Sequence, residues 1–215
     1  MVEYNIISSG SKGNAVVLER SVLIDCGVSY KQISPFTPEL RLVLLTHAHG
    51  DHFKSSTVRA LAESRPTLRF GCCEWMAKPL LDAGVLARQI DIYEPGDMYG
   101  YPGCKVCPVP LTHNVPNIGY KIHLQTGKVF YATDTGNLDG IRAPQYDLYL
   151  VEANYEDEEI QRRIVEKIES GKFPYEKRVL RDHLSKAQAD EFIYQNIGPN
   201  GVYVYMHQHE GEATE

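Results

Sequence analysis

Three histidines and an aspartate lie within six positions of the segment LLTHAHGDH, which runs from Leu44 to His52. Imidazole and carboxylate suit zinc, manganese or ferrous iron, whereas magnesium and calcium prefer an oxygen-only shell. His47 and His49 are two residues apart, so on an extended segment their rings point to the same side. Asp51 and His52 are adjacent and would diverge, which lets them serve a second ion. The segment therefore predicts a metal site, and the alternative is a polar loop that caps the next helix.

Other metal-ligand residue types follow predicted strands farther along the chain, namely His113, Asp134 and His207. Loops at one edge of a rigid sheet stack are where sites are usually built, so these positions predict one convergent centre. Two ions about 3.5 to 4 Å apart need a bridging carboxylate, and Asp134 in YATDTG is placed to bridge them. His209 competes with His207 in YMHQHEG, and we favour His207 because it directly follows the apolar strand end.

Short strands must position most of these residues. Apolar runs and alternation predict strands at 3–7, 15–19, 21–25, 41–45, 67–71, 89–93, 105–111, 119–124, 128–133, 147–153 and 201–206. Helices are expected at 55–63 and 74–82, around Ile160, Ile164 and Ile168, which share one face, and after Ser185, which forms a capping box with Gln188. This order of elements predicts an α/β (α+β) sandwich of mixed sheets covered by helices.

Length and composition indicate an ordinary globular chain. The 215 residues are 43% hydrophobic and 23% charged, and this length fits one domain over residues 1–215. No apolar run approaches the roughly 20 residues of a membrane-spanning helix, so no membrane partner is expected. The first residues lack the order of a signal peptide, and the cytoplasm is the expected location.

Five cysteines, an odd number, do not indicate a disulfide framework in a chain of this size. Cys104 and Cys107 form a CxxC, but a structural zinc needs four ligands and there is no second CxxC. Recruitment of Cys72 and Cys73 is the alternative. The net charge of −6 argues against wholesale electrostatic binding to long nucleic acid, which depends on clustered lysine and arginine.

The segment THAHGDH resembles the HxHxDH motif of the metallo-β-lactamase fold superfamily, and the later candidate ligands follow in the order that this family uses. Four further segments resemble those of the single-domain YycJ-type nucleases: SSGSKGNA, LIDCG, VEANYE and DHLSKAQA. Ribonuclease Z is a more distant relative. The resemblance implies a four-layer αββα sandwich of two mixed sheets, with the metals at one edge. A homo-oligomer remains open.

The resemblance also assigns ligands to two divalent ions, zinc or manganese. His47, His49 and His113 would hold the first ion, and Asp51, His52 and His207 the second, with Asp134 as the bridge. A hydroxide shared by the two ions would be the nucleophile, and Asp51 counts among the catalytic residues.

His183, in RDHLSKAQA, resembles the histidine that phosphodiesterase branches use near the leaving group. Glu152, in VEANY, matches the glutamate that partners this histidine in ribonuclease Z. A carboxylate partner would favour and orient the imidazolium, which a proton donor to an alkoxide needs. The alternative is a histidine at a helix N-terminus and a solvated glutamate elsewhere.

Three other features are interpreted as structural. Asp25 and Gly27 are expected to shape a turn near the metals, where outer carboxylates orient ligand histidines. The glycine-punctuated segment 8–14 lacks the strand and helix context of a dinucleotide site. His123 is expected to be a packed or surface residue.

These residues favour a metal-dependent phosphodiesterase, and most of all a nuclease resembling a DNA exonuclease. Basic residues surround His183 and could grip a phosphate backbone, although solvated surface charge explains them equally well. They are Lys172, Lys177, Arg178, Arg181 and Lys186.

Three other functions remain as alternatives. A phosphodiesterase for small substrates such as cyclic nucleotides needs no long basic track, which suits the negative net charge. Another hydrolase of this fold would cleave a lactam, lactone or thioester, but the His183–Glu152 pair argues against it because a poor alkoxide leaving group most needs an acid. The intact ligand set argues against a non-enzymatic binding protein. The choice between DNA and RNA, the exo or endo mode and the native metal stay open.

Overall fold

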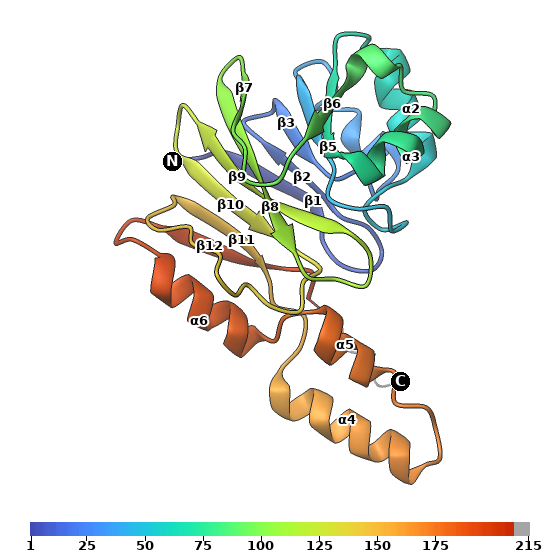
Figure 1. The fold of residues 1–215 in the computed structure, drawn as a ribbon, viewed down its shortest axis with the longest axis vertical. Coiled ribbons are helices and arrows are strands. Elements are labelled where there is room, and N and C mark those ends of the chain that lie inside the picture. The colour runs from blue at the N-terminus through green and yellow to red at the C-terminus, as the bar shows by residue number, and fades with distance from the viewer. Residues whose placement is uncertain (209–215) are drawn as a thin grey trace.

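Two mixed sheets of six strands each form the centre of the computed structural model, which describes residues 1–208 (Figure 1). The first sheet has the order β1-β2-β3-β4-β5-β6, with β1 to β3 antiparallel and β3 to β6 parallel. The second has the order β12-β11-β10-β9-β8-β7, with β7 to β10 antiparallel and β10 to β12 parallel.

The strands are short and their positions follow the predicted runs to within a few residues. The first sheet contains β1 (Tyr4–Ser8), β2 (Ala15–Leu18), β3 (Val22–Ile24), β4 (Leu42–Leu44), β5 (Arg69–Cys73) and β6 (Ile90–Tyr93). The second contains β7 (Tyr99–Tyr101), β8 (Cys104–Leu111), β9 (Asn117–Leu124), β10 (Lys128–Ala132), β11 (Leu148–Glu152) and β12 (Val202–Met206).

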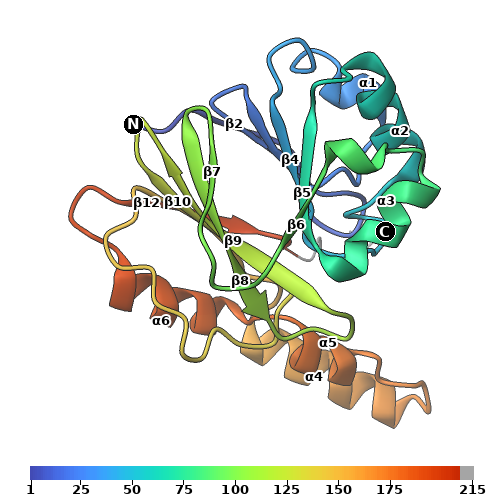
Figure 2. The same ribbon diagram turned by 45° about the horizontal axis from the view of Figure 1, so that its top comes forward.

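Helices cover the outer face of each sheet (Figures 1 and 2). The first sheet is covered by α1 (Tyr30–Ile33), α2 (Ser55–Ser64) and α3 (Ala77–Asp82), with short 3-10 turns η1 (Glu74–Met76) and η2 (Ala87–Gln89). On the other side lie α4 (Asp157–Glu169), α5 (Glu176–Asp182) and α6 (Lys186–Asn196). The predicted four-layer αββα sandwich is therefore confirmed. None of the helices in residues 1–208 is long and apolar enough to span a membrane.

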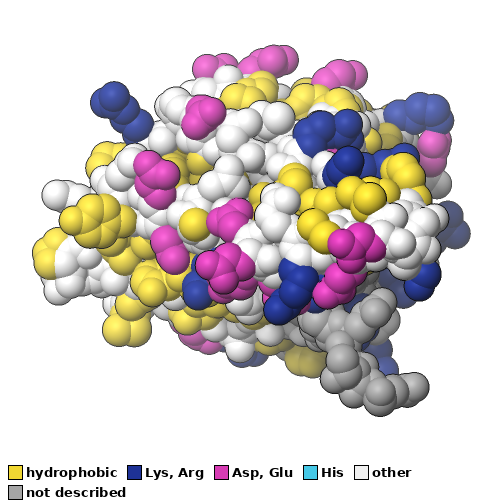
Figure 3. All heavy atoms as spheres, turned by 90° about the horizontal axis from the view of Figure 1, so that it is seen from below, with side chains coloured by type: hydrophobic (Ala, Val, Ile, Leu, Met, Phe, Trp, Pro, Cys, Tyr) yellow, Lys and Arg dark blue, Asp and Glu magenta, His cyan; other side chains and the backbone are white. Residues whose placement is uncertain are grey.

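Helices α4 and α5 lie side by side and extend below the second sheet (Figures 1 and 2). Seen from below, basic, acidic and hydrophobic side chains are interspersed over this end of the molecule (Figure 3). Ile160 and Ile164 of α4 are buried, but Ile168 on the same face is 54% exposed. The predicted helix around these three isoleucines is thus confirmed, and burial of the face that they share ends before Ile168.

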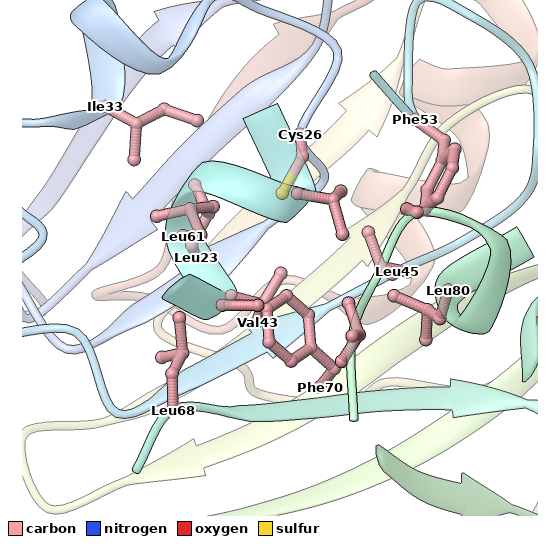
Figure 4. Close-up of a cluster of buried hydrophobic side chains, with 14 of the residues drawn as sticks. Leu23, Cys26, Ile33, Val43, Leu45, Phe53, Leu61, Leu68, Phe70 and Leu80 are labelled. Carbon is pink, nitrogen blue, oxygen red and sulfur yellow. The ribbon is translucent and has the colours of Figure 1, made fainter. Parts of the chain in front are cut away.

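Three layers of apolar side chains hold the sandwich together. Strand β2 alternates between two of them: Val16 faces the interior between the sheets, and Val17 faces α2 and α3. Leu61 of α2 and Leu80 of α3 pack in the outer cluster with Phe70 of β5 (Figure 4). A third cluster lies between the second sheet and α6. Because both faces of the sheets are covered, several strands are apolar throughout, as expected for buried strands.

Some elements differ from the predictions. The segment 74–82 is one 3-10 turn followed by α3, and not a single helix. Helix α5 and strand β7 were not predicted, because seven largely polar residues and three residues around a glycine show too little periodicity. The capping box at Ser185 is present, with Ser185 Oγ accepting from the Gln188 amide at 3.2 Å.

The parallel strands bring the candidate site residues to one edge. Because β10, β11 and β12 run in the same direction, Asp134, Glu152 and His207 emerge together at their carboxyl ends. Strand β8 is antiparallel to β9, which is antiparallel to β10, so His113 after β8 emerges at this edge as well.

Candidate metal centre

Both predicted ligand triplets come together at the edge of the sandwich where strands β10, β11 and β12 end. His47, His49 and His113 each place one ligand atom within 4.8 Å of the others, and Asp51, His52 and His207 do the same. Asp134 lies between the triplets, with one oxygen 3.9 Å from His113 Nε2 and 3.7 Å from His207 Nε2. Its other oxygen is 2.9 Å from His52 Nε2. The Asp134 carboxylate is therefore close to histidines of both triplets.

Most of these imidazoles are held by the Nδ1 atom, which leaves Nε2 facing the centre. His52 Nδ1 lies 2.7 Å from Asp25 Oδ2, and His113 Nδ1 is 2.9 Å from the Asp182 carbonyl oxygen. His207 Nδ1 lies 3.0 Å from Glu152 Oε1. Partners of this kind fix the tautomer and the ring orientation of ligand histidines, so the arrangement suits metal binding through Nε2.

Several buried polar atoms at the centre have no hydrogen-bond partner in residues 1–208. They are His113 Nε2, His207 Nε2 and Asp134 Oδ2. Asp134 Oδ2 lies 2.9 Å from His52 Nε2, and His207 Nε2 lies 3.5 Å from Asp51 Oδ2, but neither contact has the geometry of a hydrogen bond. Buried polar atoms without a partner are rare in folded proteins, and coordination of an ion is one way in which such atoms are satisfied. The donor set of imidazole nitrogens and carboxylate oxygens also suits a divalent transition ion. These residues therefore fit a divalent metal site.

Charge in the cluster also favours a cation. Burial alone lowers the pKa of His207, but the nearby carboxylates of Asp51 and Glu152 raise it to about 10. Burial raises the pKa of Asp134, yet His52 beside it holds that pKa well below its ordinary value. Burial lowers the pKa of His47 to about 2, which keeps this imidazole neutral. Protons and metal ions compete for such a carboxylate-rich group of imidazoles.

Glu152 connects the centre to His183. Its Oε1 atom lies 2.7 Å from His183 Nδ1 and 3.0 Å from His207 Nδ1, and its Oε2 atom accepts from the amides of Thr135 and Leu184. Burial raises the pKa of Glu152, but the hydrogen bonds from His183 and His207 lower it below its ordinary value. His183, 18% exposed at its side chain, keeps Nε2 available at the rim of the cluster.

Three site residues adopt left-handed backbone conformations. Asp25, Asp134 and His207 have φ values of 60°, 57° and 49°, and they are half of the six non-glycine residues with positive φ in residues 1–208. Strained conformations of this kind cluster at functional sites, because the surrounding structure must hold them. The strain agrees with a site whose side chains are positioned for binding.

The turn expected around Asp25 and Gly27 packs directly against the centre. Asp25 is fully buried and accepts from the amide and hydroxyl of Thr46, as well as contacting His52. A Cβ atom at Gly27 would lie 1.7 Å from the Asp51 carbonyl oxygen. Only glycine therefore lets this turn approach the HxHxDH loop.

The sequence did not reveal the contributions of Ser9, Asn14 and Asn154. Asn14 Nδ2 lies 2.8 Å from His52 Nε2, and Ser9 Oγ accepts from the His207 amide at 2.7 Å. Asn154 Nδ2 donates to the His207 carbonyl at 2.9 Å. Each of these residue types is also common in turns, so only the spatial neighbourhood reveals the role.

Other candidate residues lie apart from the centre. None of the potential metal clusters within residues 1–208 contains a cysteine, which argues against the alternative zinc site. His123 contacts the Tyr146 hydroxyl at 3.0 Å on β9 and joins no such cluster in this part of the chain. His209, the competitor of His207, lies outside the described residues.

The basic residues around His183 differ in their surroundings. Arg181 donates to Asp182 at 2.7 Å, and Lys186 lies 3.1 Å from Glu156, so carboxylates engage both. Lys172, Lys177 and Arg178 are exposed on α5 and on the loop before it.

A family model described as "Beta-lactamase superfamily domain" matches residues 20–193, and the chain belongs to this superfamily. Among proteins of named activity, the chain is 26% identical over 229 residues to "Exodeoxyribonuclease WalJ" of Streptococcus pneumoniae, covering 95% of this chain and 80% of the relative. It is 24% identical over 224 residues to "Exodeoxyribonuclease YycJ" of Bacillus anthracis, covering 95% of this chain and 81% of the relative.

Solved structures show the same fold. The metallo-β-lactamase fold protein YhfI of Bacillus subtilis matches with a TM-score of 0.74 and 14% identity, covering 97% of this chain and 87% of the other. The short form of human tRNase Z matches with a TM-score of 0.71 and 16% identity, covering 98% and 93%. The predicted membership of the metallo-β-lactamase fold superfamily is confirmed. With its histidine and aspartate clusters, the chain is a metal-dependent hydrolase.

Proposed function

We propose that this chain is a nuclease, a phosphodiesterase that hydrolyses DNA in the manner of an exonuclease. The observation that carries the proposal is the His183–Glu152 pair, 2.7 Å between Nδ1 and Oε1, at the rim of the candidate metal centre. The exodeoxyribonuclease names of two relatives support the choice of DNA. The proposed location is the cytoplasm.

Two divalent ions, zinc or manganese, are part of this proposal. His47, His49 and His113 would hold one, and Asp51, His52 and His207 the other, with Asp134 between them. When bound, such ions supply Lewis acidity and lower the pKa of a water molecule to near 7. Asp51, whose side chain is 23% exposed, would also accept a hydrogen bond from the attacking water.

His183 would protonate the departing alkoxide oxygen. Burial lowers the pKa of His183, but the Glu152 carboxylate raises it above its ordinary value and so favours the imidazolium. With Nδ1 held by Glu152, Nε2 is the atom that delivers the proton. Glu152 would therefore position the acid without contacting substrate.

The basic residues of the α5 region would contact the phosphate backbone. Lys177 and Arg178 are exposed on α5, and Lys172 precedes this helix. Arg181 and Lys186 would contribute less because nearby carboxylates already engage them.

A phosphodiesterase for small substrates such as cyclic nucleotides is the second candidate. Basic and acidic side chains are interspersed over the end of the molecule that carries α4 and α5 (Figure 3), and the net charge is −6. A small substrate would not need a continuous basic track.

A parallel assay separates these functions. Single-stranded DNA, RNA and cyclic nucleotides are incubated with the protein and either zinc or manganese, and the products are quantified. We expect DNA to be hydrolysed fastest, with mononucleotides released from one end. Preferential hydrolysis of a cyclic nucleotide would favour the second candidate, and hydrolysis of none of these substrates would refute both.

A further inference from the structure

A pocket of about 160 Å³ lies beside the metal centre, between the segment after β11 and helices α4 and α5. Tyr155, Ile160, Tyr175 and Val179 contribute aromatic and aliphatic side chains to its lining, and Glu176 contributes a carboxylate. An engineered cavity of about 150 Å³ with apolar walls accepts benzene. The pocket therefore has room for one six-membered ring.

Glu176 is the unusual member of the lining. The residue is only 2% exposed, and its Oε1 atom lies 2.5 Å from Lys167 Nζ. Its Oε2 atom is buried and has no hydrogen-bond partner in the part of the chain that the structure describes. A buried carboxylate oxygen without a partner is costly, so it indicates a donor that the protein itself does not supply.

The surroundings of Glu176 favour its ionised form. Burial raises the pKa of Glu176, but the hydrogen bond from Lys167 lowers it below its ordinary value. Lys167 Nζ also lies 3.4 Å from the centroid of the Tyr175 ring, which links this ring to the same ion pair. Oε2 is closed off from water in this structure, so binding of a ligand to this atom requires a neighbouring side chain of the pocket to move aside.

The pocket adjoins the candidate metal centre through Asn154. This residue lines the pocket, and its Nδ2 atom donates to the carbonyl oxygen of His207 at 2.9 Å. Gln208, the next residue after His207, lines the pocket as well. A nucleotide with its phosphate at the metal centre would therefore have this pocket as a neighbouring site for its base.

We propose that this pocket binds a cytosine base of the substrate strand, with Glu176 Oε2 accepting a hydrogen bond from the cytosine amino group. The inference rests on the proposed nuclease function. The size selects a single ring over a purine, and a carboxylate is the usual acceptor for cytosine N4. Thymine offers only N3–H between two carbonyl oxygens, which would face the carboxylate unfavourably.

Calorimetric titration with nucleoside monophosphates tests this inference apart from catalysis, because a monoester contains no phosphodiester bond to hydrolyse. Deoxycytidine 5′-monophosphate and thymidine 5′-monophosphate are titrated into the purified protein. We expect the cytosine nucleotide to bind at least about tenfold more tightly, the effect of one hydrogen bond to a charged acceptor. Equal affinities, or no binding of the cytosine nucleotide, would overturn the proposal even if the protein hydrolyses DNA.

Substitutions in the pocket test whether the preference for the cytosine nucleotide arises there. Glu176→Gln should reduce it to within about twofold, whereas Glu169→Gln, the same change at an exposed position of α4, should leave it intact. Val179→Phe retains Glu176 but fills the pocket, so it should weaken binding of the cytosine nucleotide. A preference that survives both Glu176→Gln and Val179→Phe would place the base elsewhere. The comparison of the two nucleotides in the unmodified protein stands even if a variant does not fold.

Discussion

At the level of single residues, one buried carboxylate holds two histidines for which we propose different roles. Glu152 Oε1 contacts the Nδ1 atoms of both His183 and His207, whose rings stack with centroids 5.3 Å apart. The proposed proton donor is thereby held in register with a proposed metal ligand. Since both rings are held through Nδ1, their Nε2 atoms remain for the chemistry.

The proposed acid role of His183 predicts a dependence on the leaving group. His183→Ala should slow hydrolysis of DNA about 10²- to 10⁴-fold, the usual contribution of a general acid. Hydrolysis of bis(p-nitrophenyl) phosphate should fall much less, because nitrophenolate departs without a proton. The measurement is kcat/KM for both substrates, with bound metal determined in parallel. Equal losses on the two substrates, with metal retained, would contradict the acid role.

Substitution of Asp25 should weaken metal binding, although Asp25 is not one of the proposed metal ligands. Asp25→Asn replaces one of the oxygens that hold His52 Nδ1 and Thr46, so metal affinity should fall about 10- to 100-fold. Competition with a chelating dye measures this affinity. Asp139→Asn, at an exposed position, is the matched control and should bind metal normally. Unchanged affinity in Asp25→Asn would show that His52 is held by its other contacts.

The residue types and spacing of the HxHxDH segment were sufficient to predict that its histidines converge. The supporting asparagines were not predictable in the same way. Asn14 and Asn154 lie 140 positions apart in sequence and approach the centre from different sheets. An asparagine in a loop is ordinarily explained by turn formation, and only the folded structure shows which ring it contacts.

At the level of elements, close backbone contacts bring the loops of the site together. Gly27 abuts the Asp51 carbonyl, and a Cβ atom at Gly136 would lie 2.0 Å from the Arg181 carbonyl at the end of α5. The second contact joins the loop that carries Asp134 to the helix that ends before His183. Glycine at these two positions therefore sets the distance between separate parts of the centre.

Two glycine substitutions test whether the close contact between Gly27 and the HxHxDH loop requires glycine. Gly27→Ala should lower the free energy of unfolding by at least about 2 kcal/mol, because the new Cβ atom would overlap backbone that cannot move freely. Gly50→Ala, in the same loop, has nothing within 4 Å of the new atom and should change stability by less than about 0.5 kcal/mol. Urea unfolding measures both. Similar stabilities of the two variants would contradict the packing argument.

The exposed basic residues of α5 predict a salt-dependent contribution to DNA binding. Replacing Lys177 and Arg178 together by glutamine removes two proposed phosphate contacts, so the slope of log affinity against log salt should fall by about 1.4 for a single strand. Fluorescence anisotropy with a labelled oligonucleotide measures the slope. The control replaces Lys31 and Arg41, two exposed residues near the first sheet. An unchanged slope would favour a small substrate.

Helix α5 could not be predicted from the sequence, in contrast to the buried strands. Strands that are buried on both faces form continuous apolar runs, and these were predicted well. The seven residues of α5 contain only Val179 and Leu180 as aliphatic residues, and their position follows from packing beside α4. The cluster of basic residues near His183 is visible in the sequence, but the pocket that α5 helps to form is visible only in the fold.

At the level of the whole molecule, the sandwich brings together residues from distant parts of the chain. His47 follows a strand of the first sheet, whereas His113, Asp134 and His207 follow strands of the second. The apolar runs of the strands and the resemblance to the superfamily were enough to predict this architecture. That residues 1–215 form one domain, and whether copies of the chain associate, remain predictions.

Metal titration tests the central claim most directly. The protein is stripped of metal with a chelator, and manganese or zinc is then returned in steps while bound metal and hydrolysis of single-stranded DNA are measured on the same samples. The account predicts that hydrolysis is lost on stripping and recovers to a plateau at two bound ions per chain. Full hydrolysis by the stripped protein, or saturation with metal without any recovery, would contradict a metal-dependent nuclease centre.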